Sequence, residues 1–139
     1  MVRPDVAARK IARASAWLDD AEAILSGPVE ELVAAKKDRD LAAFYLFLAI
    51  QESVDLAAHW VADAGWTVPD DAASTFDVLA DRAAIERDLA TSLRLATGLR
   101  NRIGHGYALL DHRRLHAESQ AGIPAVRDFL TAVATAAGL

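Results

Sequence analysis

Leu41-Ala-Ala-Phe-Tyr-Leu-Phe-Leu-Ala-Ile50 is the longest apolar run in the chain, and it predicts the centre of the fold. It lies between Asp38, a residue type that caps helix N-termini, and Gly65, a residue type that ends helices. The run is shorter than the roughly 20 residues that a helix needs to cross a bilayer. We therefore expect a long, buried helix over residues 38–65.

Apolar residues follow helical spacing on both sides of this segment. The other expected helices cover residues 4–25, 71–84 or 74–84, 85–103, and a last segment that starts between 111 and 115, runs toward 136 and can bend at 122–124. Residues 29–37 could form a short extra turn or a connecting helix. Gly104 and Gly106 are expected to loosen or end the helix over 85–103. No segment alternates as a strand does. The sequence predicts an all-α, up-down bundle of four or five helices, with residues 1–139 in one domain.

Composition restricts the classes of function. The chain has 139 residues, 53% of them hydrophobic, which is enough for one domain with a core. It has no cysteine, which excludes disulfides and thiolate metal sites. No apolar stretch of the signal-peptide kind follows the basic N-terminus, so we expect a cytoplasmic protein without membrane contact. The net charge of −5 argues against a general nucleic-acid coat protein.

The charge is unevenly distributed. Between residues 94 and 116 the charged side chains are Arg94, Arg100, Arg102, Arg113 and Arg114 against Asp111 alone. Such a patch can bind a polyanion even on an acidic protein, because salt confines the relevant field to about 8–10 Å. A solvated helix end and loop would explain the charge equally well. The candidate RNA contacts in this region are Arg94, Arg113, Arg114, His112 and His116.

The pattern Arg-x-x-x-x-His-x-Tyr occurs within this basic region, in Leu99-Arg-Asn-Arg-Ile-Gly-His-Gly-Tyr107. Its groups suit RNA cleavage without a metal, in which a base deprotonates the ribose 2′-OH and a cation stabilises charge on the phosphate. We assign His105 as base or acid and Arg100 as the cation. Asn101 and Arg102 could orient the phosphate or the histidine. Alternatively, Arg100 pairs with an acidic neighbour and His105 merely ends a helix.

Helical geometry limits how this motif can work. On a regular helix Arg100 and Tyr107 lie about 20° apart, whereas Arg100 and His105 lie about 140° apart. Either the flanking glycines distort the backbone at His105, or residues of two chains form the site. Symmetric dimers are the commonest oligomers, and a two-fold axis would bring two arginines and two histidines into one cleft.

Two further patterns contain residues that could support a catalytic or metal site. Gln51, Asp55 and His59 form one stripe on the expected long helix, where Asp55 could hold a motif arginine or belong to a plain polar seam. For His59 we favour the interpretation as part of a polar seam. His112 and His116 have the spacing of a helical metal pair but no clear third ligand. We favour a basic rim there for RNA or a partner, and expect neither metal nor cofactor.

The motif and its helical context resemble the HEPN (higher eukaryote and prokaryote nucleotide-binding) superfamily, and most of all its HepT-type toxins. Residues 41–60 are similar to the family's long second helix. The loop with Pro69, a short helix around residues 75–79 and the helix before the motif follow in the family's order, so nearly the whole chain is covered. The resemblance implies a homodimeric, metal-independent endoribonuclease that cleaves tRNA or mRNA. Arg100 and His105 are then the catalytic pair in the dimer cleft.

The resemblance also implies a partner and a switch. In a type II-like or type VII-like toxin–antitoxin system, a minimal nucleotidyltransferase antitoxin would silence the toxin by transferring AMP from ATP to Tyr107. The chain departs from the family at Gly104, where a bulky apolar residue usually precedes the histidine, so glycines stand on both sides of His105. The rival interpretation is a non-catalytic helical binding module, or an AMP-acceptor partner of a nucleotidyltransferase, for which Tyr107 alone would suffice.

Overall fold

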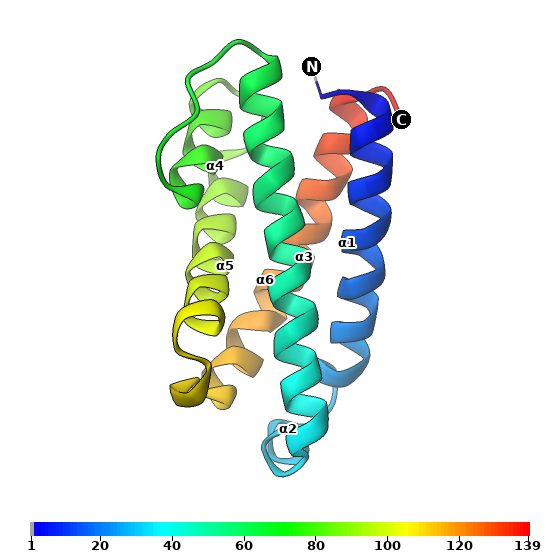
Figure 1. Ribbon diagram of the computed structural model, residues 1–139, viewed down its shortest axis with the longest axis vertical. Coiled ribbons are helices and arrows are strands. Elements are labelled where there is room, and N and C mark those ends of the chain that lie inside the picture. Colours follow the sequence, from blue (N-terminus) through cyan, green and yellow to red (C-terminus); the bar gives the residue numbers. More distant parts are fainter. Residues whose placement is uncertain (1) are drawn as a thin grey trace.

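Long helices that run up and down beside one another form the fold. The computed structural model describes residues 2–139, in which every regular element is helical. In chain order the elements are α1 (Pro4–Leu25), α2 (Val29–Ala34), α3 (Lys36–Asp63), α4 (Ala72–Asp81), α5 (Arg87–Gly106), the 3-10 helix η1 (Tyr107–Leu109) and α6 (His112–Ala136). Helices α1, α3, α5 and α6 alternate in direction along the long axis, and α4 lies beside the start of α5 (Figure 1). The expected all-α, up-down bundle is confirmed.

Helix α3 is the central element, packed against α1, α4, α5 and α6. Its most extensive contact is with α1, whose buried Ala7, Ala14 and Ala21 leave room for a close approach of the two helices. By length and composition α3 could cross a membrane, but 56% of its apolar window is buried inside the bundle. Burial of this apolar surface is the main term that stabilises the fold, so α3 is a core helix, as expected.

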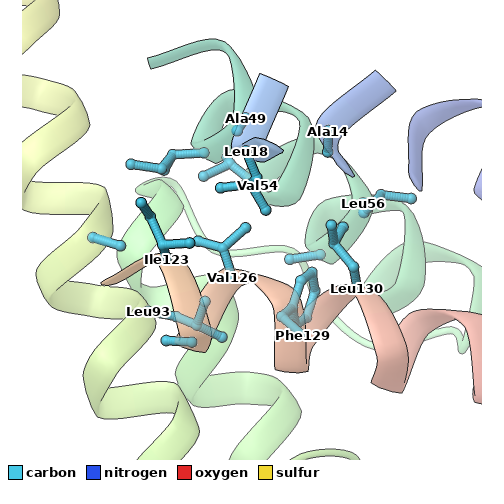
Figure 2. Packing of buried hydrophobic residues seen from close by; sticks show 14 of the residues in the cluster. Ala14, Leu18, Ala49, Val54, Leu56, Leu93, Ile123, Val126, Phe129 and Leu130 are labelled. Atoms are coloured by element: carbon cyan, nitrogen blue, oxygen red, sulfur yellow. The ribbon is translucent and has the colours of Figure 1, made fainter. Parts of the chain in front are cut away.

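The core between these helices is built from large side chains of α6 meeting those of the other elements. Figure 2 shows Val126 and Phe129 of α6 beside Leu18 of α1 and Val54 of α3. The Phe129 ring also meets Phe76 of α4 edge to face, with ring centroids 5.2 Å apart. This geometry is the preferred one for aromatic pairs. The motif-bearing helix α5 is therefore supported by a packed core.

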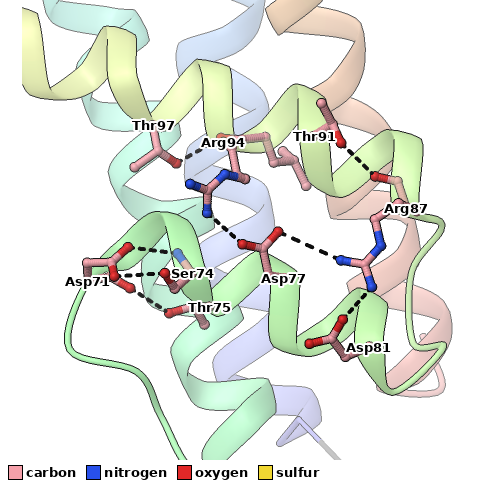
Figure 3. A network of polar contacts seen from close by, with 10 residues as sticks. Asp71, Ser74, Thr75, Asp77, Asp81, Arg87, Thr91, Arg94 and Thr97 are labelled. Atoms are coloured by element: carbon pink, nitrogen blue, oxygen red, sulfur yellow. Dashed lines mark hydrogen bonds and ion pairs between the residues drawn. The ribbon is translucent and has the colours of Figure 1, made fainter.

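The helix starts follow the sequence more closely than the helix ends. Asp71 caps α4 by accepting a hydrogen bond from the Ser74 backbone N–H at 2.9 Å, and Asp111 caps α6 in the same way through Arg114 at 3.0 Å (Figure 3 shows the α4 cap). Helix α4 ends at Asp81, earlier than expected, and Ala83 beyond it has a φ of 57° that a right-handed helix does not allow.

The end of α5 corrects a sequence expectation. The helix does not stop near Ile103 but continues through Gly104 and His105 to Gly106, where φ −154° and ψ 44° leave helical geometry. Gly104 lies against the ring of Phe47 on α3, and a Cβ atom there would come within 3.0 Å of Phe47 Cε2. Its missing side chain thus permits close packing of α5 on α3, while Gly106 ends the helix.

Candidate functional site

The residues of the Arg-x-x-x-x-His-x-Tyr motif lie where the end of α5 and η1 pass antiparallel to the first half of α3. Residues three, four and seven apart on a helix share one face, so two stripes of side chains meet here. The meeting pairs are Gln51 with Arg100, Phe47 with Gly104, and Asp40 with Tyr107. We call Arg100, Gly104 and Tyr107 the α3 face of the motif. The expectation that Arg100 and Tyr107 share a face is confirmed.

Arg100 is held by two amide oxygens. Its Nη1 donates to Gln51 Oε1 at 3.0 Å, and its Nε donates to Asn101 Oδ1 at 3.1 Å. The Gln51 amide nitrogen in turn donates to Asp55 Oδ1 at 3.1 Å, and Lys10 Nζ lies 3.8 Å from the other Asp55 oxygen. The hypothesis that Asp55 pairs directly with a motif arginine is thus corrected. Gln51 is one helical turn nearer to Arg100 and links the two.

His105 lies on the opposite side of the helix, which we call the α6 face of the motif. Its exposed side chain lines a hollow of about 450 Å³ between the end of α5, η1 and the start of α6. Asn101, Arg102, Asp111 and Arg114 are the other polar residues that line this hollow. Because α5 stays helical through Gly104, the backbone distortion considered above is absent. One chain therefore brings Arg100 and His105 to the same helix end but not to the same face.

Tyr107 contacts α3 through its hydroxyl, which donates a hydrogen bond to Asp40 Oδ1. Its ring meets His112 edge-on, with centroids 5.8 Å apart. Burial, and then the Asp40 carboxylate, raises the pKa of Tyr107 to about 12. A hydrogen bond from Lys36, 2.8 Å from Asp40 Oδ2, together with the bond from Tyr107, lowers the pKa of Asp40. At neutral pH a carboxylate therefore faces a protonated phenol.

A second hollow, mainly apolar and of about 390 Å³, opens beside the Tyr107 hydroxyl. Phe44, Phe47 and Ile103 supply its apolar wall, and Asp40 supplies a polar edge. Phe44 is 54% exposed, which is unusual for a phenylalanine on the central helix of a bundle. Tyr107 therefore borders open space, although its hydroxyl is hydrogen-bonded to Asp40.

Most of the basic side chains proposed to contact RNA already have protein partners. The contacts are Arg94 Nη1 to Asp77 at 2.6 Å, Arg113 Nη1 and Nη2 to Glu30 at 2.5 and 2.8 Å, Arg114 Nε to Glu118 at 3.0 Å and His116 Nε2 to the Gly27 carbonyl at 2.9 Å. Arg102 also pairs with Glu118. Figure 3 shows Arg94 between α5 and α4. Exposed ion pairs contribute only about 0–1 kcal/mol, so RNA phosphates could displace these carboxylates. The contacts with RNA stay predictions.

Of the His112 and His116 pair, His116 is hydrogen-bonded within the bundle, whereas His112 Nδ1 is buried with no hydrogen-bond partner among the described residues. The bond from His116 to Gly27 takes one imidazole nitrogen, and burial lowers the pKa of His112. No group of three or more side chains suited to a metal occurs within residues 2–139. His59, the last residue of the polar stripe, is exposed and lies beyond Asp55, away from Arg100.

Two residues of the site escaped the sequence reasoning, Asp40 and Phe47. Both continue, toward the N-terminus, the stripe that holds Gln51 and Asp55, at intervals of seven and four residues. Extending that stripe beyond its polar members would have found them. The signal was hidden because Phe47 lies inside the apolar run and Asp40 lies just before it.

Comparison with known proteins agrees with this fold. The family model described as Ribonuclease HepT-like matches residues 16–133. A toxin–antitoxin complex with AMP-PNP shares 19% identity, covering 93% of this chain and 98% of that chain with a TM-score of 0.83. A tri-AMPylated Shewanella oneidensis HEPN toxin in complex with MNT antitoxin shares 20%, covering 94% and 98%, with a TM-score of 0.85.

A third similar structure is YutE from Bacillus subtilis, a cytosolic protein of unknown function, at 16% identity and a TM-score of 0.75, covering 91% of this chain and 87% of that chain. No curated protein matches significantly in sequence. At these identities the structures establish the fold, and the family match extends over most of the chain. The chain belongs to the ribonuclease HepT-like family.

Proposed function

We propose that this protein is a metal-independent endoribonuclease toxin that acts as a homodimer, with Arg100 and His105 of both chains in one cleft. The observation that carries this proposal is the division of the motif between two faces of α5. Arg100 is fixed against α3, whereas His105 faces a hollow with further polar groups. A second chain on a two-fold axis would bring its own Arg100 and His105 to the same cleft, so that each arginine has a histidine nearby.

The proposed reaction is attack by the ribose 2′-oxygen on the adjacent phosphorus. His105 of one chain takes the 2′-OH proton as the O2′–P bond forms, and the P–O5′ bond breaks. The second histidine returns a proton to the leaving 5′-oxygen. Arg100 stabilises the charge that develops on the phosphate oxygens. The products are a 2′,3′-cyclic phosphate and a 5′-hydroxyl end. The proposed reaction needs no metal.

The proposed control is AMP transfer to Tyr107 by a minimal nucleotidyltransferase antitoxin. Two of the similar structures are toxin–antitoxin complexes, and one toxin is tri-AMPylated. Tyr107 stands on the α3 face, on the order of 10 Å from Arg100 along the helix axis. A phosphate attached there would lie within the screening distance of the Arg100 charge and compete with RNA for it. We place the protein in the cytoplasm, with tRNA or mRNA as substrate.

The test is cleavage of RNA in EDTA by the wild type, Arg100→Ala and His105→Ala, with the product ends analysed. Cleavage by the wild type to 2′,3′-cyclic phosphate ends, lost in both variants, is the expected result. Activity that survives both substitutions would refute the catalytic assignment. Inactivity of the wild type, combined with AMP on Tyr107, would favour the rival, a non-catalytic acceptor partner of the nucleotidyltransferase.

A further inference from the structure

We infer that Asp40 is the proton acceptor for adenylyl transfer to Tyr107, so that this chain supplies a catalytic carboxylate for its own modification. The inference rests on the proposed function of Tyr107 as the AMP acceptor. It goes further by assigning a chemical role to a residue 67 positions away in the sequence.

The carboxylate of Asp40 is oriented at both of its oxygens. Oδ1 accepts the hydrogen bond from the Tyr107 hydroxyl, and Oδ2 lies 2.8 Å from Lys36 Nζ. Lys36 is one helical turn before Asp40 on α3, so this ion pair is local and holds the carboxylate without other elements. Oδ1 is thus directed at the phenol by contacts that exist before any nucleotide binds.

Proton removal is the chemical difficulty at this acceptor. A neutral phenol is a weak nucleophile, and the environment of Tyr107 raises its pKa to about 12, so the phenolate is scarce at neutral pH. The proton must leave while the new bond forms. Asp40 is the base in contact with it, and protein kinases likewise use an aspartate to accept the proton of the attacking hydroxyl.

The step balances without further reagents. The Tyr107 oxygen attacks the α-phosphorus of ATP, the O–P bond forms, and the bond from that phosphorus to the bridging oxygen of pyrophosphate breaks. The phenol proton passes to Asp40 Oδ1 and from there to solvent, while pyrophosphate leaves with the electron pair. Nothing is oxidised or reduced.

The charges around Asp40 are compatible with a triphosphate. Arg39 Nε lies 4.0 Å from Asp40 Oδ1, so Lys36 and Arg39 together provide two cations beside one carboxylate. At the Tyr107 hydroxyl itself the carboxylate of Asp40 outweighs Arg39, so the two cations lie beside the proton acceptor rather than at the attacking oxygen. Tyr107 is 37% exposed and lines the hollow beside Phe44.

The experiment compares Asp40→Asn with a matched control. Asparagine keeps an oxygen that accepts the phenol hydrogen bond but cannot take the proton. Asp38→Asn makes the same charge change two residues away, at an exposed position in the first turn of α3. Each purified chain is incubated with its cognate minimal nucleotidyltransferase, ATP and Mg²⁺. Mass spectrometry of the Tyr107 peptide then gives kcat and KM with the chain as substrate.

We expect Asp40→Asn to lower kcat by about 10²-fold or more, the usual contribution of a general base, with KM unchanged. Asp38→Asn should behave as wild type, and Asp40→Glu should restore part of the rate. An unchanged kcat in Asp40→Asn, or a loss confined to KM, would overturn the inference and leave the modification of Tyr107 intact. A wild-type chain that is never modified would overturn both.

Discussion

The two faces of α5 around the motif are built in opposite ways. On the α3 face, Arg100, Gly104 and Tyr107 each meet a partner residue of α3. On the α6 face, His105 lines an open hollow. One chain by itself therefore holds Arg100 and Tyr107 against α3, but leaves His105 facing space that another surface can complete.

This division has an energetic reason. An arginine carries about 2 kcal/mol of side-chain entropy, and the bonds to Gln51 and Asn101 restrict it before substrate binds. A cation positioned in advance contributes more to transition-state stabilisation than one that must be ordered during the reaction. A histidine that moves protons gains from the opposite arrangement, since an internal hydrogen bond would compete with substrate.

RNA cleavage should change most when Arg100 and His105 are removed from different chains. Arg100→Ala and His105→Ala should each lower RNA cleavage by about 10²-fold or more. When the two variants are mixed and allowed to exchange subunits, a heterodimer contains one intact α3 face and one intact α6 face. We expect part of the cleavage to return in the mixture, measured with the RNA substrate in EDTA, because such a heterodimer holds one histidine where the wild type holds two.

The control for this exchange is the double variant Arg100→Ala/His105→Ala mixed with wild type at the same ratio. If each chain works alone, the mixture of single variants stays inactive, because neither variant holds both residues. That outcome would contradict the two-chain site while leaving both residues catalytic.

The next effect concerns the support of Arg100 on the α3 face. Gln51→Ala removes a hydrogen bond to a charged group, typically worth about 1.5–3 kcal/mol, so we expect cleavage to fall by about tenfold or more. Asp55→Ala acts only through Gln51 and should lower cleavage less, without unfolding the domain. Rates and thermal melting curves of both variants test this order. A greater loss in Asp55→Ala would restore direct pairing of Asp55 with a motif arginine.

Gly104 and Phe47 offer a smaller effect, on stability. Gly104→Leu forces a side chain into the space of the Phe47 ring, which lies 3.0 Å from the Cβ position, and overpacking typically costs about 1–3 kcal/mol. Phe47→Ala empties that space. The double variant should therefore lose less free energy of unfolding than the sum of the losses in the two single variants. Denaturant unfolding of all four chains measures the coupling. Simple additivity would show that the glycine does not serve this contact.

Sequence reasoning reached the fold and one face of the site. The run from Leu41 to Ile50 identified the core helix, and the angle between Arg100 and Tyr107 identified a shared face. The sequence does not predict the register between α3 and α5, because that register depends on tertiary packing at Phe47 and Gly104. For this reason the sequence does not predict the partner of Tyr107, and it leaves open whether Asp55 supports a motif arginine, a contact that Gln51 makes.

A still smaller change is expected at the end of the α3 face, in the titration of Tyr107. Its pKa, raised from 10.0 to about 12, means that the folded state holds the phenol proton more tightly than the unfolded chain does. The stability this provides is present below pH 10 and is lost as the pH rises toward 12. Asp40→Asn removes the nearby charge but not the burial, so the pKa should fall and stay above its ordinary value. The chain has two tyrosines, so a Tyr45→Phe background isolates the phenolate absorbance of Tyr107. An identical titration with aspartate or asparagine at position 40 would mean that the hydroxyl does not face that carboxylate in solution.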